Sequence, residues 1–325
     1  MIDGAALVFA PVVEAVLQTA MAGVMAGTLY GLMACGVGLI FGVMRVVNFA
    51  QGEFLMLGMY GAVFTAALIA PLGLFGVTTR AYIAVLLTGP PIFLLGVVIH
   101  RVVLSRSTGL RAAGAEGEGH YTQMILTLGI SLILQNLALA WFTAVPRQNR
   151  TPISDKAWML EPIPGMDAAV FINQGQAVSC VVAIALVVAI YFAFSRTLLG
   201  KALRAAADNP IAATYVGIKV ERAHRLAFGF GVAITAVAGG LVAIYYPFQP
   251  YVGVQFLIIM YAAVVLGGLG SILGAFWGGL IIGIVQQISA LFMPIELQSA
   301  AIFIVLVVTL FVKPDGIFGT NVDRV

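Results

Sequence analysis

Residues 195–225 read S-R-T-L-L-G-K-A-L-R-A-A-A-D-N-P-I-A-A-T-Y-V-G-I-K-V-E-R-A-H-R and form a polar segment between two long apolar runs. The segment holds six of the sixteen Lys and Arg residues of the chain, whereas the runs Ala177–Phe194 and Leu226–Tyr245 on either side contain no charged residue. Apolar runs of this length, separated by a short basic segment, are typical of helices that cross a lipid bilayer. The pattern therefore predicts a membrane protein with this segment on the cytoplasmic side.

The composition of the whole chain supports a membrane protein. Of its 325 residues, 62% are hydrophobic and 9% are charged, whereas a soluble domain carries about 25% charged residues. In lipid, every backbone polar group must be paired within the protein, which permits helical bundles and closed barrels. Because the apolar runs are far longer than a barrel strand, we predict an all-α fold, a polytopic transmembrane helical bundle with about 8–9 membrane segments, some broken or re-entrant. We expect residues 1–325 to form a single transmembrane domain surrounded by membrane lipid, and the net charge of +3 indicates no nucleic-acid partner.

Nine apolar segments follow one another along the chain. The first is too long for one upright helix, because about 20 residues cross a bilayer, and we expect it to be tilted, kinked or followed by a re-entrant turn. The stretch Phe256–Phe292 is too long for one crossing as well, and we divide it at V-L-G-G-L-G-S, residues 265–271. The predicted segments are Val13–Val43, Phe54–Ala70, Ala81–Ile99, Gln123–Ala144, Ala177–Phe194, Leu226–Tyr245, Phe256–Leu266, Ile272–Phe292 and Ala300–Val312.

Basic residues in the loops predict the side of the membrane on which each loop lies. Twelve of the sixteen Lys and Arg residues lie in loops or ends that we place inside, among them residues 195–225 and the C-terminus. The N-terminus, which has no basic residue before Arg45, is then outside, and an odd number of crossings brings the C-terminus inside. The longest outside loop, residues 146–176, contains four Pro residues and Trp158 and is expected to form a structured cap or a short interfacial helix.

R-V-V-N-F-A-Q-G-E, residues 45–53, places Asn48, Gln51 and Glu53 between two apolar runs. Polar side chains at membrane depth need partners or water. One interpretation is an interfacial turn with Arg45 and Glu53 at the level of the lipid headgroups. The other is a re-entrant element that lines a pathway or contacts a partner. Arg45 and Glu53 could neutralise one another.

Small residues at positions 202–207 predict a helix within the polar segment, from Gly200 to Tyr215. A solvated loop is one interpretation of this segment, and docking to a cytoplasmic partner is the other. The small side chains would permit close contact with a partner, and the choice between the two interpretations depends on the resemblance described below. Lys201 and Arg204 would fix the polarity of the contact, and Asp208 could meet a cation on the partner.

A second Gly-rich run, residues 264–279, has a small residue at every fourth position through Gly270, Gly274 and Gly278. This spacing favours close helix crossing over direct contact with a ligand. The similar texture of Val24–Gly42 and Val265–Gly283 is compatible with an internal repeat or with ordinary helix packing. Our candidates for residues that line a pathway, or interrupt the backbone beside it, are Tyr30, Asn48, Gln51, Glu53, Gly267, Gly268 and Gly270.

The sequence lacks the patterns of an enzyme active site. Gly200-Lys201 is followed by Ala202, without the rest of a phosphate-binding loop. The three His residues are far apart with no metal spacing, and the two Cys residues lie in apolar runs, where we expect small buried hydrophobes. We therefore expect no catalytic residues, no metal and no cofactor of its own. The His and Cys residues are His100, His120, His224, Cys35 and Cys180.

Five motifs occur in order along nearly the whole chain. They are N-F-A-Q-G-E-F at residues 48–54, T-L-G-I-S-L-I-L-Q-N at 127–136, G-K-A-L-R-A-A-A-D-N at 200–209 followed by Gly217-Ile218, V-L-G-G-L-G-S-I-L-G-A at 265–275, and K-P-D-G-I-F-G at 313–319. With these motifs the chain resembles the permeases of the high-affinity branched-chain amino acid ABC importers, of the LivH type. It departs from them at Gln51, where the family usually has His, and at Asn209, where the family often has a second acid after Asp208.

The resemblance implies a transmembrane subunit in a bacterial inner membrane that translocates branched-chain or related amino acids. It also implies partners: a second related permease, two cytoplasmic ATP-binding subunits and a periplasmic substrate-binding protein, with ATP bound by the partner subunits. The N-terminus would then be periplasmic, residues 146–176 a periplasmic loop, and residues 195–225 a cytoplasmic coupling loop. The residues that couple the chain to the ATPase would be Gly200, Lys201, Arg204, Asp208, Asn209 and Gly217.

Two other transport functions remain as alternatives. Relatives of the family carry urea, short amides or aromatic acids. A secondary transporter driven by an ion gradient would need acidic residues deep in its helices. Only Glu53 and Glu296 come near that condition, and both are close to the ends of the predicted spans. Dependence of uptake on an ATPase encoded beside this chain would discriminate an ABC importer from the ion-coupled transporter.

Overall fold

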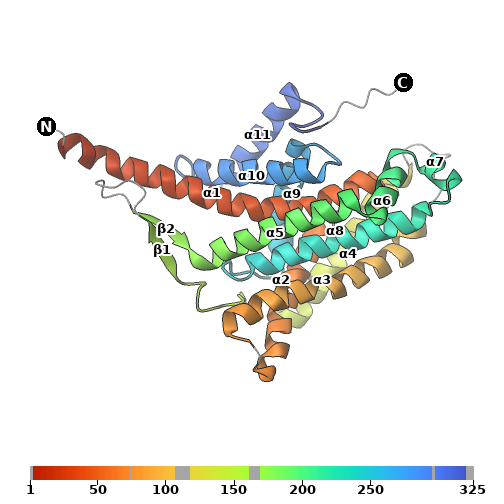
Figure 1. The fold of residues 1–325 in the computed structure, drawn as a ribbon, viewed down its shortest axis with the longest axis horizontal. Coiled ribbons are helices and arrows are strands. Elements are labelled where there is room, and N and C mark those ends of the chain that lie inside the picture. Colours follow the sequence, from red (N-terminus) through yellow and green to blue (C-terminus); the bar gives the residue numbers. More distant parts are fainter. Residues whose placement is uncertain (1–2, 74, 107–117, 161–168, 295–296, 320–325) are drawn as a thin grey trace.

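The computed structural model describes residues 3–73, 75–106, 118–160, 169–294 and 297–319. Within them the chain is an all-α helical bundle with two short strands, as expected of a multi-pass membrane protein (Figure 1). The elements are α1 (Asp3–Met44), α2 (Gln51–Ile69), η1 (Ala70–Leu72), α3 (Val77–Val102), η2 (Leu104–Arg106), α4 (Glu118–Phe142), β1 (Ala157–Leu160), β2 (Val170–Asn173), α5 (Gln174–Arg196), α6 (Leu198–Asp208), α7 (Pro210–Tyr215), α8 (Val220–Val242), α9 (Val252–Gly267), α10 (Ile272–Ser289) and α11 (Gln298–Val312).

Each predicted apolar segment corresponds to its own helix. The division within residues 265–271 is confirmed, since α9 ends at Gly267 and α10 begins at Ile272. In the described chain, seven helices are long and apolar enough to cross a membrane, whereas α9 and α11 are apolar but shorter. The helix predicted within the polar segment is present as two helices, because Pro210 ends α6 and begins α7.

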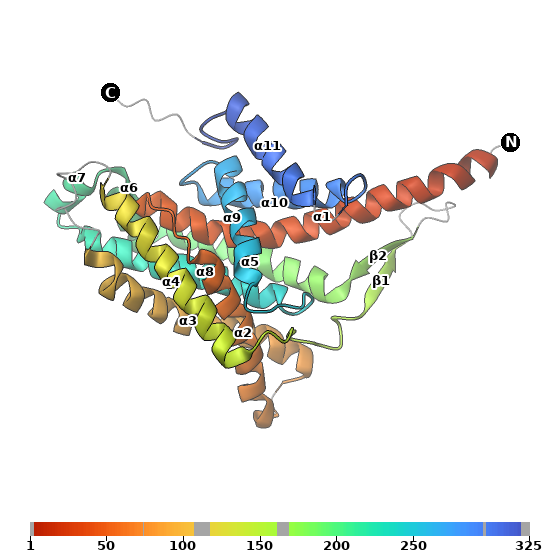
Figure 2. The ribbon, with the colours of Figure 1, turned by 180° about the vertical axis from the view of Figure 1, so that it is seen from behind.

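The first apolar run is one unbroken helix followed by a re-entrant turn. The apolar span of α1, Pro11–Met44, has 34 residues, and at 1.5 Å per residue it is about 50 Å long, beyond the ~30 Å of a hydrocarbon core. Both views show the N-terminal part of α1 projecting from the bundle (Figures 1 and 2). Arg45 then adopts a φ of 55°, and residues 45–50 return into the bundle before α2 begins.

Glycine residues bring α1 and α10 into close contact along their length. A Cβ atom on Gly279 would lie 2.3 Å from the backbone nitrogen of Gly31, and one on Gly283 would lie 2.2 Å from the Cα atom of Gly27. Larger residues would push the two helices apart. The two Gly-rich runs therefore pack against each other, which agrees with the interpretation as helix crossing.

The largest buried cluster lies where α1, α2, α8, α9 and α10 meet. Met33, Met59 and Met260 are fully buried in it. Cys35 belongs to this cluster and Cys180 to a smaller one beside β2, and both are free and buried, as predicted. The apolar span of α4, in contrast, is mostly exposed, and α4 packs mainly on α2.

The two ends of the bundle carry different structures. At one end, called here the hairpin end, β1 and β2 form an antiparallel pair in which Trp158 lies opposite Ile172. At the other, called the α6–α7 end, α6 and α7 lie outside the long helices (Figure 1). Of the two expectations for residues 146–176, the described part of that loop fits the structured cap and not the interfacial helix, since V-F-I-N is rich in strand-favouring residues and pairs with A-W-M-L.

Candidate functional site

The re-entrant turn, residues 45–50, carries polar groups into the bundle. Asn48 is buried, and its backbone N–H donates to the hydroxyl of Tyr261 in α9 at 2.7 Å. The same hydroxyl donates to the Asn48 carbonyl at 2.9 Å. The side-chain oxygen of Asn48 accepts from the N–H of Ala50 at 3.1 Å. These bonds satisfy groups that water would otherwise have to reach.

Gln51, the first residue of α2, uses both ends of its side-chain amide. Its Nε2 donates to Thr235 Oγ1 at 2.6 Å and to the Gly231 carbonyl at 3.3 Å. Its Oε1 accepts from Asn48 Nδ2 at 2.9 Å. Thr235 lies within the membrane-length helix α8, so Gln51 is at membrane depth. At the position where the resembling permeases usually have His, an amide thus joins α2 to α8.

Glu53 lies in the first turn of α2 and is 1% exposed. Its Oε1 accepts a hydrogen bond of 3.4 Å from Ser131, which is near the middle of α4. Its Oε2 is buried and has no hydrogen-bond partner. No ion pair reaches this carboxylate within the part of the chain that the structure describes. Glu53 is therefore a deep acid with one weak partner.

Arg45 and Glu53 do not pair. The Arg45 guanidinium donates to the Ala207 carbonyl of α6 at 3.4 Å, whereas Glu53 lies beside Ser131 in the bundle interior. Glu53 lies in the first turn of the α2 span, as the sequence indicated, but this turn is buried inside the bundle, so the interpretation that places both charges at headgroup level is wrong. The reason is the re-entrant turn, which takes the chain from the α6–α7 end to the interior before α2 begins.

α6 and α7 are short helices with a capping side chain each. Thr197 Oγ1 accepts from the N–H of Gly200 at 3.2 Å, and Asn209 Oδ1 accepts from the N–H of Ala212 at 2.9 Å. Gly217 follows α7 with a φ of 86°, a left-handed conformation that favours glycine. Because Asn and Asp are equally good N-caps, Asn209 preserves the local structure that an acid would give.

α6 has one face on the bundle and one in solvent. Leu203 and Ala206 are buried and belong to a cluster with residues of α1 and α8. Lys201, Arg204 and Asp208 are exposed. The charged residues predicted to meet a partner are therefore accessible to a second protein, and two of them, Arg204 and Asp208, also line a pocket on the bundle side of the helix.

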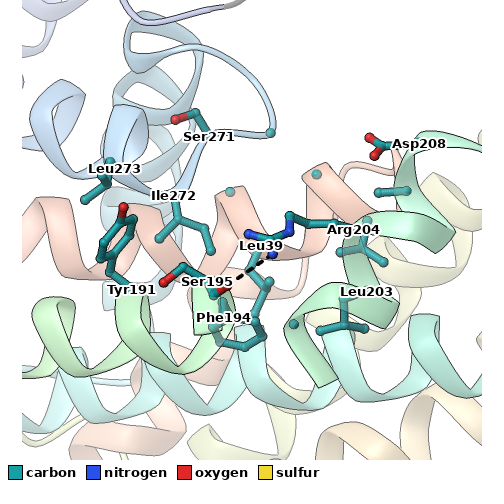
Figure 3. A pocket seen from close by; sticks show the side chains of 16 residues that line it. Leu39, Tyr191, Phe194, Ser195, Leu203, Arg204, Asp208, Ser271, Ile272 and Leu273 are labelled. Atoms are coloured by element: carbon teal, nitrogen blue, oxygen red, sulfur yellow. Dashed lines mark hydrogen bonds between the residues drawn. The ribbon is translucent and has the colours of Figure 1, made fainter. Parts of the chain in front are cut away.

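A pocket of about 340 Å³ lies between α6 and the bundle. Gly200, Arg204 and Asp208 line it from one side, and Gly270 and Ser271, in the turn between α9 and α10, line it from another (Figure 3). Arg204 donates to the carbonyl of Ser195 at 3.2 Å. The structure thus brings three predicted coupling residues together with one residue of the predicted backbone break.

The other pathway candidates lie in separate places. Gly267 and Gly268 end α9 at the α6–α7 end, where Gly268, with a φ of 104°, packs against Gly319. Tyr30 lies in α1, and its ring centroid is 6.1 Å from that of Phe256. Asn48, Gln51 and Glu53, which together with their hydrogen-bond partners are called here the central cluster, lie elsewhere in the bundle. The candidates therefore do not converge on a single site.

The sequence reasoning missed four partners of this central cluster. Thr127 Oγ1 accepts from the N–H of Phe49 at 3.2 Å, and Ser131 donates to the buried carboxylate, both from α4. Their spacing of four residues puts them on one face of a helix and could have indicated them. Thr235 and Tyr261 carry no such signal, since each is isolated within an apolar helix.

Known proteins resemble the chain over almost its whole length. Residues 19–310 match the family model described as the branched-chain amino acid transport system permease component. The high-affinity branched-chain amino acid transport system permease protein LivH is 31% identical over 305 residues in Salmonella typhimurium and in Escherichia coli K12, covering 93% of this chain and 95% of the relative. The corresponding permease protein BraD of Pseudomonas aeruginosa is 27% identical, with the same coverage. The residues matched by the family model include both the central cluster and α6–α7.

Proposed function

The chain belongs to the family of branched-chain amino acid transport permeases, and from this premise we propose that it is the transmembrane subunit of an ABC importer for branched-chain or related amino acids. In this proposal two separate ATP-binding subunits drive transport, a second related permease completes the pathway, and a periplasmic binding protein delivers the solute. ATP is bound by the partner subunits. The observation that carries the proposal is the match to LivH across 93% of the chain.

We propose further that the protein lies in a bacterial inner membrane with a periplasmic N-terminus and a cytoplasmic C-terminus. The α6–α7 end then faces the cytoplasm. Support comes from the gathering of basic segments at that end. Arg45 bonds to α6, and the segment after Lys313 packs on the end of α9, where the N–H of Ile317 donates to the Leu266 carbonyl at 2.9 Å.

Exposed apolar side chains support α6 and α7 as the surface for an ATP-binding subunit. Leu198, Tyr215 and Val216 are 83%, 86% and 76% exposed. They lie in the polar segment, outside the apolar spans, where such side chains are typical of a protein contact. A push on α6 by this partner would reach the pocket beside it and the turn between α9 and α10.

ATP hydrolysis by the complete complex in liposomes tests the proposal. The complex is titrated with leucine-loaded binding protein, as wild type and as the double variant Arg204→Glu and Asp208→Lys. We expect the loaded protein to stimulate hydrolysis in the wild type and roughly tenfold less in the variant, because both charges of the contact are reversed. Lys313→Glu, an exposed charge reversal at the C-terminal end of α11 and outside α6 and α7, is the matched control and retains stimulation.

One observation favours a second candidate function, an ion-coupled secondary transporter. Glu53 is the one buried acid among the described residues, and acids at membrane depth are typical of proton or sodium coupling. If no ATPase co-purifies and uptake follows an imposed proton or sodium gradient, the ABC proposal is wrong and this candidate replaces it. If ATPase is stimulated by urea, a short amide or an aromatic acid instead of leucine, the importer stands with another substrate.

A further inference from the structure

Two helices begin inside the bundle, and their N-termini meet there. α2 starts at Gln51 and α9 at Val252. Gly52 and Gly253 touch at this point, since a Cβ atom on Gly52 would lie 2.1 Å from the Gly253 carbonyl oxygen. From this contact the two helices leave in opposite directions (Figure 2). α2 is long enough to cross a membrane whereas α9 is shorter, and their N-termini meet within the bundle.

The N-terminus of α9 carries no side-chain cap. Its N-cap residue, Tyr251, is exposed and makes no capping hydrogen bond, and of the first turn the N–H of Val252 donates to the Gln249 carbonyl at 3.0 Å. The N–H groups of a first helical turn have no partner within the helix and carry positive partial charge, so they favour anions such as carboxylates. This N-terminus is therefore suited to a negatively charged group.

Glu53 brings a negative charge to the same place. A Cβ atom on Gly253 would lie 2.9 Å from Glu53 Oε1, so the carboxylate touches the first turn of α9. Its second oxygen, Oε2, is buried and unpartnered, although a carboxylate at this depth is stable only beside a positive group or a proton. The contact between α2 and α9 thus presents an anion-favouring helix end beside an acid that lacks a cation.

We propose that these two features together receive an α-amino acid within the membrane. The carboxylate of the solute binds the first turn of α9, and its ammonium group binds Glu53. This inference rests on the proposed function and adds the chemistry that the pathway selects, a zwitterion rather than neutral urea or a short amide. Asn48 and Gln51 take no part, because each already binds the other and the surrounding helices.

The site is closed in this structure. Glu53 is buried and Gly52 is in contact with Gly253, so a solute enters only when α9 separates from α2. α9 ends at Gly267, directly before the turn that lines the pocket beside α6. A movement of α6 that displaces this turn would therefore be transmitted to the site along α9.

The experiment compares two solutes that differ in one group. Leucine carries the ammonium, and 2-hydroxy-4-methylpentanoate carries a hydroxyl in its place. Uptake of each is measured in liposomes that hold the complete importer and its binding protein, as wild type and as Glu53→Gln. For each complex, the uptake of leucine is divided by the uptake of the hydroxy acid. The wild-type and Glu53→Gln complexes use the same binding protein, so its own preference cancels when these two ratios are compared.

We expect Glu53→Gln to lower the preference for leucine by about tenfold, because a hydrogen bond between two charged groups is lost. Glu221→Gln, the same change in the first turn of α8, is the matched control and leaves the preference unchanged. An unchanged preference in Glu53→Gln, with leucine uptake by the wild type, overturns the site and leaves the proposed function standing. Wild-type uptake of urea but of no amino acid overturns the proposed amino acid substrate, and the site with it.

A second variant separates recognition from folding. Glu53→Asp keeps the charge and shortens its reach, so we expect it to raise the KM for leucine while it retains a preference for leucine over the hydroxy acid. If Glu53→Gln fails to co-purify with its partners, this variant decides the question. Equal loss of uptake of both solutes in Glu53→Asp would show a structural role and overturn the site. Uptake driven by a proton gradient and lost in Glu53→Gln would do the same in favour of ion coupling.

Discussion

Gln51 illustrates how a single polar residue is accommodated at membrane depth. Its amide donates to Thr235 and Gly231 and accepts from Asn48. A neutral imidazole offers one donor and one acceptor, so a His at this position cannot make all three bonds. The residue that departs from the usual family motif is therefore matched to its neighbours in this chain.

Gln51→Ala is expected to lower the free energy of unfolding by about 1–3 kcal/mol, because it leaves the buried Asn48 amide without its acceptor. Gln51→His should fall between this variant and the wild type. Denaturant unfolding of the detergent-solubilised protein measures the effect. Gln249→Ala, at an exposed position, is the control and should not change the midpoint. Equal midpoints for Gln51→Ala and Gln249→Ala would show that the hydrogen bonds of Gln51 contribute nothing.

At the scale of elements, the contact between α1 and α10 depends on glycine, whereas α4 is only loosely attached. Gly279 lies in backbone contact with Gly31, so a side chain at either position must displace a helix. A Cβ atom added to Gly129 of α4 would have no atom of another segment within 4 Å. The same substitution should thus have opposite effects at Gly279 and at Gly129.

We expect Gly279→Ala to destabilise the protein by about 1–3 kcal/mol through overpacking. Gly129→Ala should leave stability unchanged or raise it by up to about 1 kcal/mol, because Ala is the better helix former. Thermal unfolding of the two purified variants under the same conditions measures both. Stabilisation by Gly279→Ala would mean that α1 and α10 do not pack as closely as described.

The caps of α6 and α7 provide a second test at this scale. Asn209→Ala removes the side-chain acceptor at the start of α7 and should cost that helix about 1 kcal/mol. Asn209→Asp keeps an acceptor and should behave as the wild type. Hydrogen exchange of residues 210–216 in the complex is the measurement, with faster exchange expected in Asn209→Ala alone. Faster exchange in both variants would show that the charge, and not the cap, matters at this position.

At the scale of the whole molecule, the bundle has two chemically different ends. β1 and β2 lie at the hairpin end, and the basic segment with α6 and α7 lies at the other (Figure 1). The central cluster lies between them. α9 contacts this cluster through Tyr261 and ends at the turn that lines the pocket beside α6. The proposed orientation therefore assigns solute delivery to one end and the contact with the ATP-binding subunit to the other.

Cysteine labelling in intact and permeabilised cells tests that orientation. We expect Trp158→Cys in β1 to react with an impermeant thiol reagent in intact cells. Lys201→Cys in α6 should react only after permeabilisation. Cys35 and Cys180 are buried, so the wild type should give little background. Reaction of both introduced cysteines in intact cells would contradict the orientation.

Local chemistry along the chain was enough to predict the helices, the break before Ile272 and the exposed position of Lys201, Arg204 and Asp208. Apolar length, Gly and Pro punctuation and clustered charge are properties of neighbouring residues, and helices in lipid satisfy their own backbone. The depth of Glu53 was different. Glu53 lies in the first turn of the α2 span, as its position at the start of an apolar run indicated, but the structure places that turn in the interior of the bundle.

The depth of Asn48, Gln51 and Glu53 in the bundle, and the identity of their hydrogen-bond partners, depended on contacts between segments that are distant in sequence. Gln51 bonds Thr235 across 184 positions, and Asn48 bonds Tyr261 across 213. Hydrophobic pattern reports that a segment enters the bilayer, but not where along the membrane normal it starts or which helix faces it. The closed contact between Gly52 and Gly253, and the unpaired acid beside it, exist only because the N-termini of α2 and α9 meet in the folded bundle.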